Sequence, residues 1–183
     1  MDAGSGDQHA AFRRLFEDAY RPLLAYSLRR TESAADAEEI VAETLLIAWR
    51  RRDELPLGAG SIPWLYGVAR RVIANQRRGQ QRRGRLERML APLMRSSQDP
   101  ELTVQLADAT RAVVAASRRL PDADREVLRL AAWEGLSHAQ IAISLGCSEN
   151  AAALRLHRAR QRLREELAKE GRFPGQEVVE VIR

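Results

Sequence analysis

Residues 120–169 read LPDADREVLRLAAWEGLSHAQIAISLGCSENAAALRLHRARQRLREELAK. Apolar residues recur in this segment at three- and four-residue spacing, which is the periodicity of amphipathic α-helices. The pattern predicts three helices, over residues 123–133, 138–145 and about 149–169. A short helix that is followed by a tight turn and a longer helix is typical of a helix-turn-helix.

The ends of the short helix carry local signals. Ser137 and Ser148 stand where the N-caps of the second and third helices are expected, because a serine hydroxyl accepts a hydrogen bond from a free backbone N–H. Gly146 ends the short helix, since glycine tolerates the left-handed conformation that a helix exit often requires. The inward stripe of the long helix is expected at Ala152, Leu156, Ala159 and Leu163.

The second helix of a helix-turn-helix enters the major groove of DNA with residues near its N-terminus. Polar residues at this end form the predicted DNA-binding set: Ser148, Glu149, Asn150, Arg155, His157, Arg158 and Arg160. Arg155 and Arg158 can reach guanine edges or phosphates. His157 has no second ligand near it in the sequence, so no metal site is expected there, and Cys147 is expected to pack in the turn.

The first half of the chain also shows helical spacing. One helix is expected over residues 10–30, where Pro22 would introduce a kink. A second is expected over residues 33–52, with Ser33 or Asp36 as its N-cap.

A third helix is expected to begin after Pro63, because proline suits the first turn of a helix. The preceding residues 55–63 hold two prolines and two glycines and are expected to form a loop. Gly79 and Gly84 are expected to break the far end of the third helix.

That far end is strongly basic. Eight arginines face one acid, Glu87: Arg70, Arg71, Arg77, Arg78, Arg82, Arg83, Arg85 and Arg88. Such a density of like charge suits contact with a polyanion, and phosphate neutralisation gives affinity that falls steeply with salt. An unstructured basic tether is the alternative.

Three acids share one side of the expected second helix: Asp36, Glu39 and Glu43. This side suits a basic protein partner, because complementary charge sets orientation and association rate. Ordinary helix-surface charge is the alternative.

Composition limits the class of protein. The chain has 183 residues, with 30 Lys+Arg against 25 Asp+Glu and a net charge of +5. Lys169 is the one lysine; arginine binds phosphate and guanine bidentately, although a GC-rich genome would also favour it. No apolar run approaches the roughly 18 residues of a membrane span and no secretory leader is visible, so a cytoplasmic protein without membrane, metal or other cofactor is expected.

The patterns together predict an all-α chain of two small helical domains that a flexible linker joins. The expected bounds are 8–88 for the first domain, 89–111 for the linker, 112–170 for the second domain and 171–183 for a C-terminal tail. The tail could dock as a strand or helix, or stay loose.

In order and spacing, these segments resemble an extracytoplasmic-function (ECF) sigma factor of bacterial RNA polymerase, a branch of the sigma-70 superfamily, from about residue 11 to residue 167. The residues that carry the resemblance are Leu15-Phe16-Glu17, Tyr20, Asp36 to Thr44, Ala48-Trp49, Trp64 to Arg70, Leu120-Pro121, Arg125 to Leu128, Gly135-Leu136-Ser137, Ile141-Ala142 and Leu156 to Arg160.

The resemblance implies that the first domain is a sigma region 2 bundle, which binds the promoter −10 element and the β′ clamp of core RNA polymerase. The −10 contacts would come from Trp64, Arg70, Arg71, Asn75, Arg77 and Arg78. The polymerase contacts would come from Asp36, Glu39 and Glu43. The loop over residues 53–63 would hold a flipped base.

The second domain would be sigma region 4, whose helix-turn-helix binds the −35 element and whose other surface binds the β flap. The linker would thread through the polymerase toward the RNA exit path. Many members of the family are held inactive by an anti-sigma factor that clamps both domains, and the resemblance allows such a partner here.

The chain departs from the family pattern at several positions. Ala42 stands where a glutamine is frequent, and Arg71 where an asparagine is common. The recognition helix opens with Asn150-Ala151-Ala152-Ala153-Leu154 in place of Gly-Thr-Val-Lys-Ser. These alanines favour a weaker or apolar readout, such as contact with a thymine methyl group.

Two other classes of function compete with a sigma factor. A stand-alone helix-turn-helix regulator would leave the acidic helix and the segment around Trp64 without a role. A helical enzyme would require a phosphate-binding glycine loop, a metal-ligand spacing or a paired acid and nucleophile, and the sequence offers none of these. The chain is therefore expected not to be an enzyme.

Overall fold

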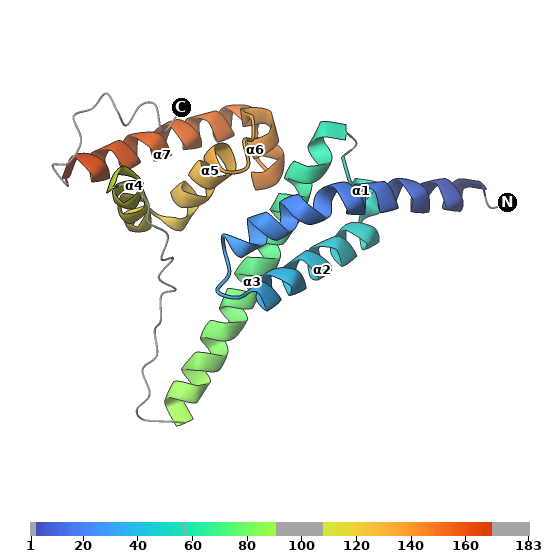
Figure 1. The fold of residues 1–183 in the computed structure, drawn as a ribbon, viewed down its shortest axis with the longest axis horizontal. Helices are drawn as coiled ribbons and strands as arrows, with labels where there is room; N and C mark the ends of the chain where they lie inside the picture. Colours follow the sequence, from blue (N-terminus) through green and yellow to red (C-terminus); the bar gives the residue numbers. More distant parts are fainter. Residues whose placement is uncertain (1–2, 57, 91–107, 170–183) are drawn as a thin grey trace. The chain divides into compact units, whose positions relative to one another are not determined.

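The computed structural model describes residues 3–56, 58–90 and 108–169. Seven α-helices and two short 3-10 helices lie in these residues, and none of the described residues forms a β-strand, so the all-α prediction is confirmed (Figure 1). The chain divides into two compact units, Met1–Glu101 (unit 1) and Leu102–Arg183 (unit 2).

Unit 1 is a bundle of three helices: α1 (Ala3–Leu28), α2 (Ala34–Arg50) and α3 (Ser61–Leu90). Each of the three contacts the other two. Their apolar sides meet in a core that contains Leu23, Tyr26, Ile40, Val41, Leu65 and Val72, all nearly inaccessible to solvent. The rings of Tyr26 and Tyr66 stack with their centroids 4.7 Å apart, which fixes α1 against α3.

The N-cap of α2 is Ser33. Its hydroxyl accepts a hydrogen bond from the backbone N–H of Asp36 at 3.0 Å, so Ser33 and not Asp36 supplies the cap. Asp36 lies in the first turn, where a carboxylate interacts favourably with the helix dipole. In α1 the helix continues through Pro22 to Leu28.

The segment between α2 and α3 is more regular than predicted. It contains two 3-10 helices, η1 (Arg52–Glu54) and η2 (Gly58–Gly60), and α3 begins at Ser61, so that Pro63 lies in its first turn. The Ser61 hydroxyl donates to the carbonyl oxygens of Pro56 at 2.7 Å and Gly58 at 3.0 Å. Gly58 has a φ of +65°, a conformation that side chains disfavour.

The predicted break at Gly79 and Gly84 is wrong, because α3 continues through both glycines to Leu90. A glycine inside a helix costs only about 1 kcal/mol relative to alanine and keeps its backbone hydrogen bond. The arginines and glutamines around the two glycines are good helix formers, so propagation of the helix outweighs that cost.

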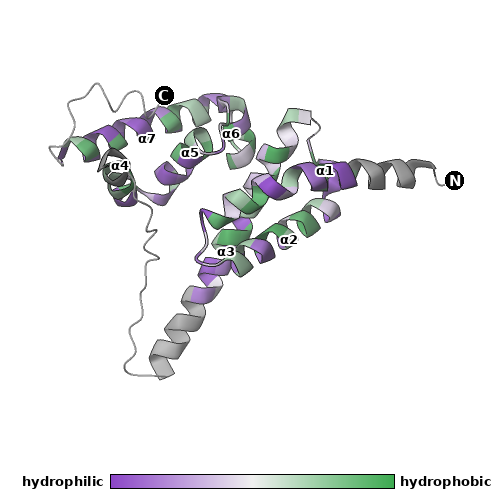
Figure 2. Ribbon diagram, in the orientation of Figure 1, coloured by the Kyte–Doolittle hydropathy of each residue, from purple (hydrophilic) through white to green (hydrophobic). Residues whose placement is uncertain are grey.

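Unit 2 contains α4 (Asp108–Arg119), α5 (Asp122–Ala132), α6 (His138–Leu145) and α7 (Glu149–Lys169). The long helix α7 packs against each of the other three. Polar and apolar residues alternate along it (Figure 2), as expected for a helix with one buried side. One core cluster contains Ala112, Ala116, Leu120, Leu163 and Leu167.

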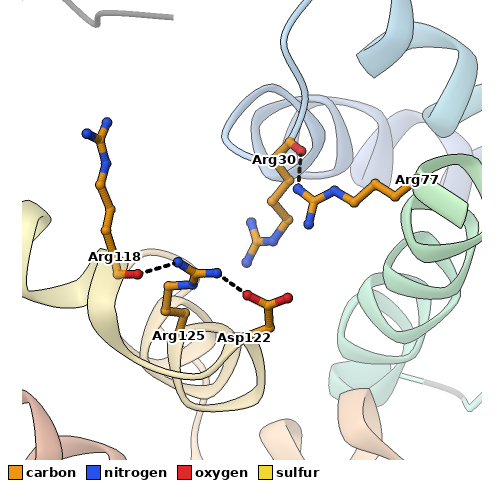
Figure 3. A network of polar contacts seen from close by, with 5 residues as sticks. All are labelled: Arg30, Arg77, Arg118, Asp122 and Arg125. Atoms are coloured by element: carbon orange, nitrogen blue, oxygen red, sulfur yellow. Dashed lines mark hydrogen bonds and ion pairs between the residues drawn. The ribbon is translucent and has the colours of Figure 1, made fainter. Parts of the chain in front are cut away.

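The junction of α4 and α5 is held by Arg125. Its guanidinium donates to the backbone carbonyl oxygen of Arg118 at 2.9 Å and pairs with Asp122 (Figure 3). Pro121 is the N-cap of α5 and makes no side-chain capping bond. The guanidinium therefore ties the end of one helix to the start of the next.

The predicted linker is described only at its edges, and the predicted tail lies wholly outside the described residues. Residues 91–107, the middle of the linker, and residues 170–183, which include the tail, lie outside the described part of the chain. Residues 89–90 and 108–111, predicted as linker, are helical and belong to α3 and α4.

Candidate nucleic-acid interface

The helix-turn-helix of unit 2 is built from local hydrogen bonds. Ser137 and Gln140 form a capping box at the start of α6: the Ser137 hydroxyl accepts from the Gln140 N–H at 3.3 Å, and the Gln140 side chain accepts from the Ser137 N–H at 2.9 Å. The predicted cap and the predicted bounds of α6 are both confirmed.

The turn between α6 and α7 is also formed by local hydrogen bonds. Gly146 takes the left-handed conformation, with φ 66° and ψ 46°, and the Cys147 N–H donates to the Ala142 carbonyl oxygen at 3.0 Å. The Ser148 hydroxyl then accepts from the Ala151 N–H at 3.2 Å and caps α7. Cys147 is half-buried in this turn. Hydrogen bonds between near neighbours in the sequence thus define the turn between α6 and α7.

One side of α7 is buried and the other is open. Ala152, Leu156, Ala159 and Leu163 are buried, as predicted. The exposed members of the predicted DNA-binding set are Ser148, Glu149, Asn150, Arg155, His157 and Arg158, and Arg160 is half-buried. The first three turns of α7 therefore present polar and cationic side chains to the surroundings.

Leu154 is an exposed residue of α7 that the sequence analysis did not place in the interface. The predicted DNA-binding set contains polar side chains only, and the apolar readout was assigned to the alanines that precede Leu154. The helical register holds the signal that would have found it, since Leu154 lies four residues after Asn150 and four before Arg158.

In unit 1 the predicted −10 residues lie on two sides of α3. Arg71, Asn75 and Arg78 are exposed and follow one another at four- and three-residue spacing, so they share one side. The Arg78 guanidinium donates to the Asn75 side-chain oxygen. The side chains of Arg82, Arg83, Arg85, Glu87 and Arg88 lie outside the described residues.

Arg70 and Arg77 lie on a different side of α3. Arg70 is half-buried, and its Nε is buried without a hydrogen-bond partner. Arg77 donates to the backbone carbonyl oxygen of Arg30 at 2.8 Å (Figure 3). Arg30 in turn is buried, lies 3.5 Å from the ring centroid of Tyr26 and donates to the Tyr26 carbonyl oxygen. Arg77 therefore has a structural partner that the sequence did not reveal.

Trp64 lies half-buried near the start of α3, beside the segment that precedes it. The Arg51 guanidinium lies 5.7 Å from its ring centroid, within cation–π distance. Arg51 also pairs with Glu54; its hydrogen bond to Glu54 raises the pKa of Arg51, and the same bond lowers the pKa of Glu54 below its ordinary value. A cation thus connects Trp64 with η1.

The acidic side of α2 is open. Glu39 and Glu43 are exposed, and Asp36 is half-buried. Leu46, three residues after Glu43, is also exposed on this side and was not predicted to take part. The outward surface of α2 therefore combines negative charge with one large apolar side chain.

Two kinds of feature are absent from the described residues. None of the helices in this part of the chain is long and apolar enough to cross a membrane. No group of three or more His, Cys, Asp or Glu side chains there is placed to hold a metal ion.

A capped helix-turn-helix in one helical unit, together with an arginine-lined helix beside an acidic helix in the other, defines a two-domain DNA-binding protein. The sequence matches the family descriptions "Sigma-70 region 2" over residues 15–83 and "Sigma-70, region 4" over residues 110–163. The chain belongs to the ECF sigma factors of RNA polymerase, which confirms the predicted family.

Individual relatives agree with this assignment. The ECF RNA polymerase sigma factor SigL of Mycobacterium tuberculosis is 33% identical over 170 residues, which cover 90% of this chain and 93% of SigL. The RNA polymerase sigma factor NccH of Alcaligenes xylosoxydans xylosoxydans is 29% identical over 165 residues, 88% of each chain. The sigma factor RpoE of Bartonella quintana, solved in complex with the anti-sigma factor NepR, shares the fold with a TM-score of 0.60 and 24% identity, over 86% of this chain and 97% of RpoE.

Proposed function

We propose that this sigma factor binds core RNA polymerase through the acidic side of α2 and places its two units on two promoter elements. Unit 1 would take the −10 element and unit 2 the −35 element. The observation that carries the proposal is the division of charge: the acids Glu39 and Glu43 lie on a helix of unit 1, whereas the exposed cations of the helix-turn-helix lie on α7 of unit 2.

The protein-facing surface is the outward side of α2. Carboxylates there would meet basic residues of the polymerase clamp, and complementary charge would orient the docking. Exposed Leu46 would add an apolar contact at the end of the same surface. The flap contact of unit 2 stays a prediction, as does an anti-sigma partner.

The −10 surface would consist of the exposed row Arg71, Asn75 and Arg78. Trp64 and the segment over residues 53–63 would surround a base that has left the duplex, since an aromatic ring next to a cation suits stacking on a base. Arg77, whose guanidinium bonds to the Arg30 carbonyl oxygen, would act mainly by holding α3 in place. Arg70 lies on the same side of α3 as Arg77, and its contact with the −10 element stays a prediction.

The −35 surface would be the outward side of α7. Asn150 and Arg158 would face base edges, because they lie on the side of the helix away from the core. Arg155, exposed at the edge of that side, would contact phosphate.

We further propose that the chain is not an enzyme and works in the cytoplasm with the polymerase. The discriminating experiment is run-off transcription with purified core RNA polymerase on a library of genomic fragments. We expect defined start sites that require both proteins and two upstream elements. A stand-alone regulator would instead bind a palindrome tightly without polymerase and leave the start sites unchanged.

A further inference from the structure

The outward side of α7 carries one large apolar residue among the described side chains of its first three turns, Leu154. Its relative exposure is 48%, and its neighbours one turn away, Asn150 and Arg158, are exposed as well. An exposed leucine alone would carry little meaning, because much of any protein surface is apolar. The position of this leucine on the helix is what indicates a function.

An α-helix turns by about 100° per residue. The buried residues Ala152, Leu156 and Ala159 define the side of α7 that faces the core, and Leu154 projects from the opposite side. Arg155 is turned toward one edge. Leu154, rather than either neighbouring arginine, is therefore the residue most directly opposed to the core.

That side faces the base edges when the second helix of a helix-turn-helix enters the major groove. The C5-methyl group of thymine is the apolar group that the bases present there. Asn150, His157 and Arg158 surround Leu154 with polar groups, which favours a base edge over an apolar protein surface as its partner.

We propose that Leu154 is a specificity-determining residue that packs against the methyl group of a thymine in the −35 element. The inference rests on the proposed function, because it takes the outward side of α7 as the DNA-facing side. It adds the chemical class of base that this chain selects.

The test removes one methyl group at a time. A promoter obtained from the run-off experiment is synthesised with each thymine of its −35 element, on either strand, replaced in turn by deoxyuridine, which keeps the base pairing. Initiation is measured with core RNA polymerase and the full-length chain at limiting concentration. At one position we expect initiation to fall about fourfold, the change expected when one methyl group loses an apolar contact.

Two variants make the assignment specific. With Leu154→Ala, we expect the same uracil replacement to have no effect, since the side chain that senses the methyl group is gone. Leu28→Ala is the matched control, because Leu28 is equally exposed, at 47%, but lies in unit 1. It should retain the fourfold effect.

The possible failures can be told apart. A wild-type chain that starts no transcription with core polymerase overturns the proposed function and this inference with it. A chain that initiates from a −35 element, yet shows no sensitive thymine, overturns the role of Leu154 alone. A methyl effect that persists in Leu154→Ala does the same.

Discussion

Arg77 of α3 donates a hydrogen bond to the backbone carbonyl oxygen of Arg30, 47 positions earlier in the chain, at 2.8 Å. Arg30 follows the end of α1, where backbone carbonyl groups lack helical partners and a cation is favourable. The bond therefore joins the segment after α1 to α3 within unit 1. It gives an arginine of a basic helix a role in stability.

We expect Arg77→Ala to lower the unfolding free energy of unit 1 by about 1 kcal/mol, because the carbonyl oxygen loses a charged donor. Arg78→Ala should change it by less than about 0.5 kcal/mol, since Arg78 bonds within its own helix turn. Urea unfolding followed by tryptophan fluorescence in a Trp133→Phe background measures the unfolding free energy of unit 1, because the two remaining tryptophans, Trp49 and Trp64, lie in that unit. Equal losses in the two variants would contradict the role of Arg77.

We expect Glu39→Arg with Glu43→Arg to abolish binding to core RNA polymerase, because both changes reverse charge on the exposed side of α2. Glu32→Arg with Glu38→Arg is the matched control: it makes the same change of charge at exposed positions away from that side. A pull-down with core polymerase measures binding, and circular dichroism checks the helix content of both variants. Retained binding in the first variant would reject the acidic side of α2 as the docking surface.

Arg155 and Arg158 should differ in how they act. We expect Arg155→Ala to weaken initiation about equally on promoters with intact and scrambled −35 elements, as for a phosphate contact. The slope of the logarithm of affinity against the logarithm of salt concentration should fall in magnitude by about 1. Arg158→Ala should cost about 1–3 kcal/mol on the intact element only, as for a base contact. Initiation assays over a range of salt concentrations separate the two, and the reverse pattern would exchange the two roles.

Replacement of two glycines by alanine should change the unfolding free energy in opposite directions. Gly79 lies inside α3, and an added Cβ would meet no atom within 4 Å, so we expect Gly79→Ala to stabilise unit 1 by about 0.5–1 kcal/mol. Gly135 has a φ of +64°, so Gly135→Ala should destabilise unit 2 by about 1–2 kcal/mol, despite equally open space. Chemical unfolding of both variants measures this. A loss of stability in Gly79→Ala would indicate that α3 depends on its glycine.

The helix-turn-helix could be predicted closely because its signals are local. Ser137, Gln140 and Ser148 bond to backbone groups three residues away, and Gly146 acts through its own φ. Such bonds involve neighbours in the sequence and depend little on the rest of the fold.

Other features escaped prediction for physical reasons. The bond from Arg77 joins residues far apart in the chain, so no local sequence pattern predicts it. Gly79 looked like a break, but its small cost was outweighed by the cooperativity of α3. The outward position of Leu154 follows from the same helical register that places Ala152 and Leu156 in the core, but an apolar side chain gives no charge or hydrogen-bonding signal for DNA contact, so it was not included in the predicted interface.

The buried side of α7 supports the fold and its outward side is exposed, and this separation has an evolutionary consequence. Folding depends on Ala152, Leu156 and Ala159, together with the hydroxyl of Ser148, while the opposite residues contribute little to it. Positions 150, 154 and 158 can therefore be exchanged without rebuilding the scaffold. A gene duplicate could acquire a new set of target promoters through a handful of surface substitutions while its architecture stays unchanged.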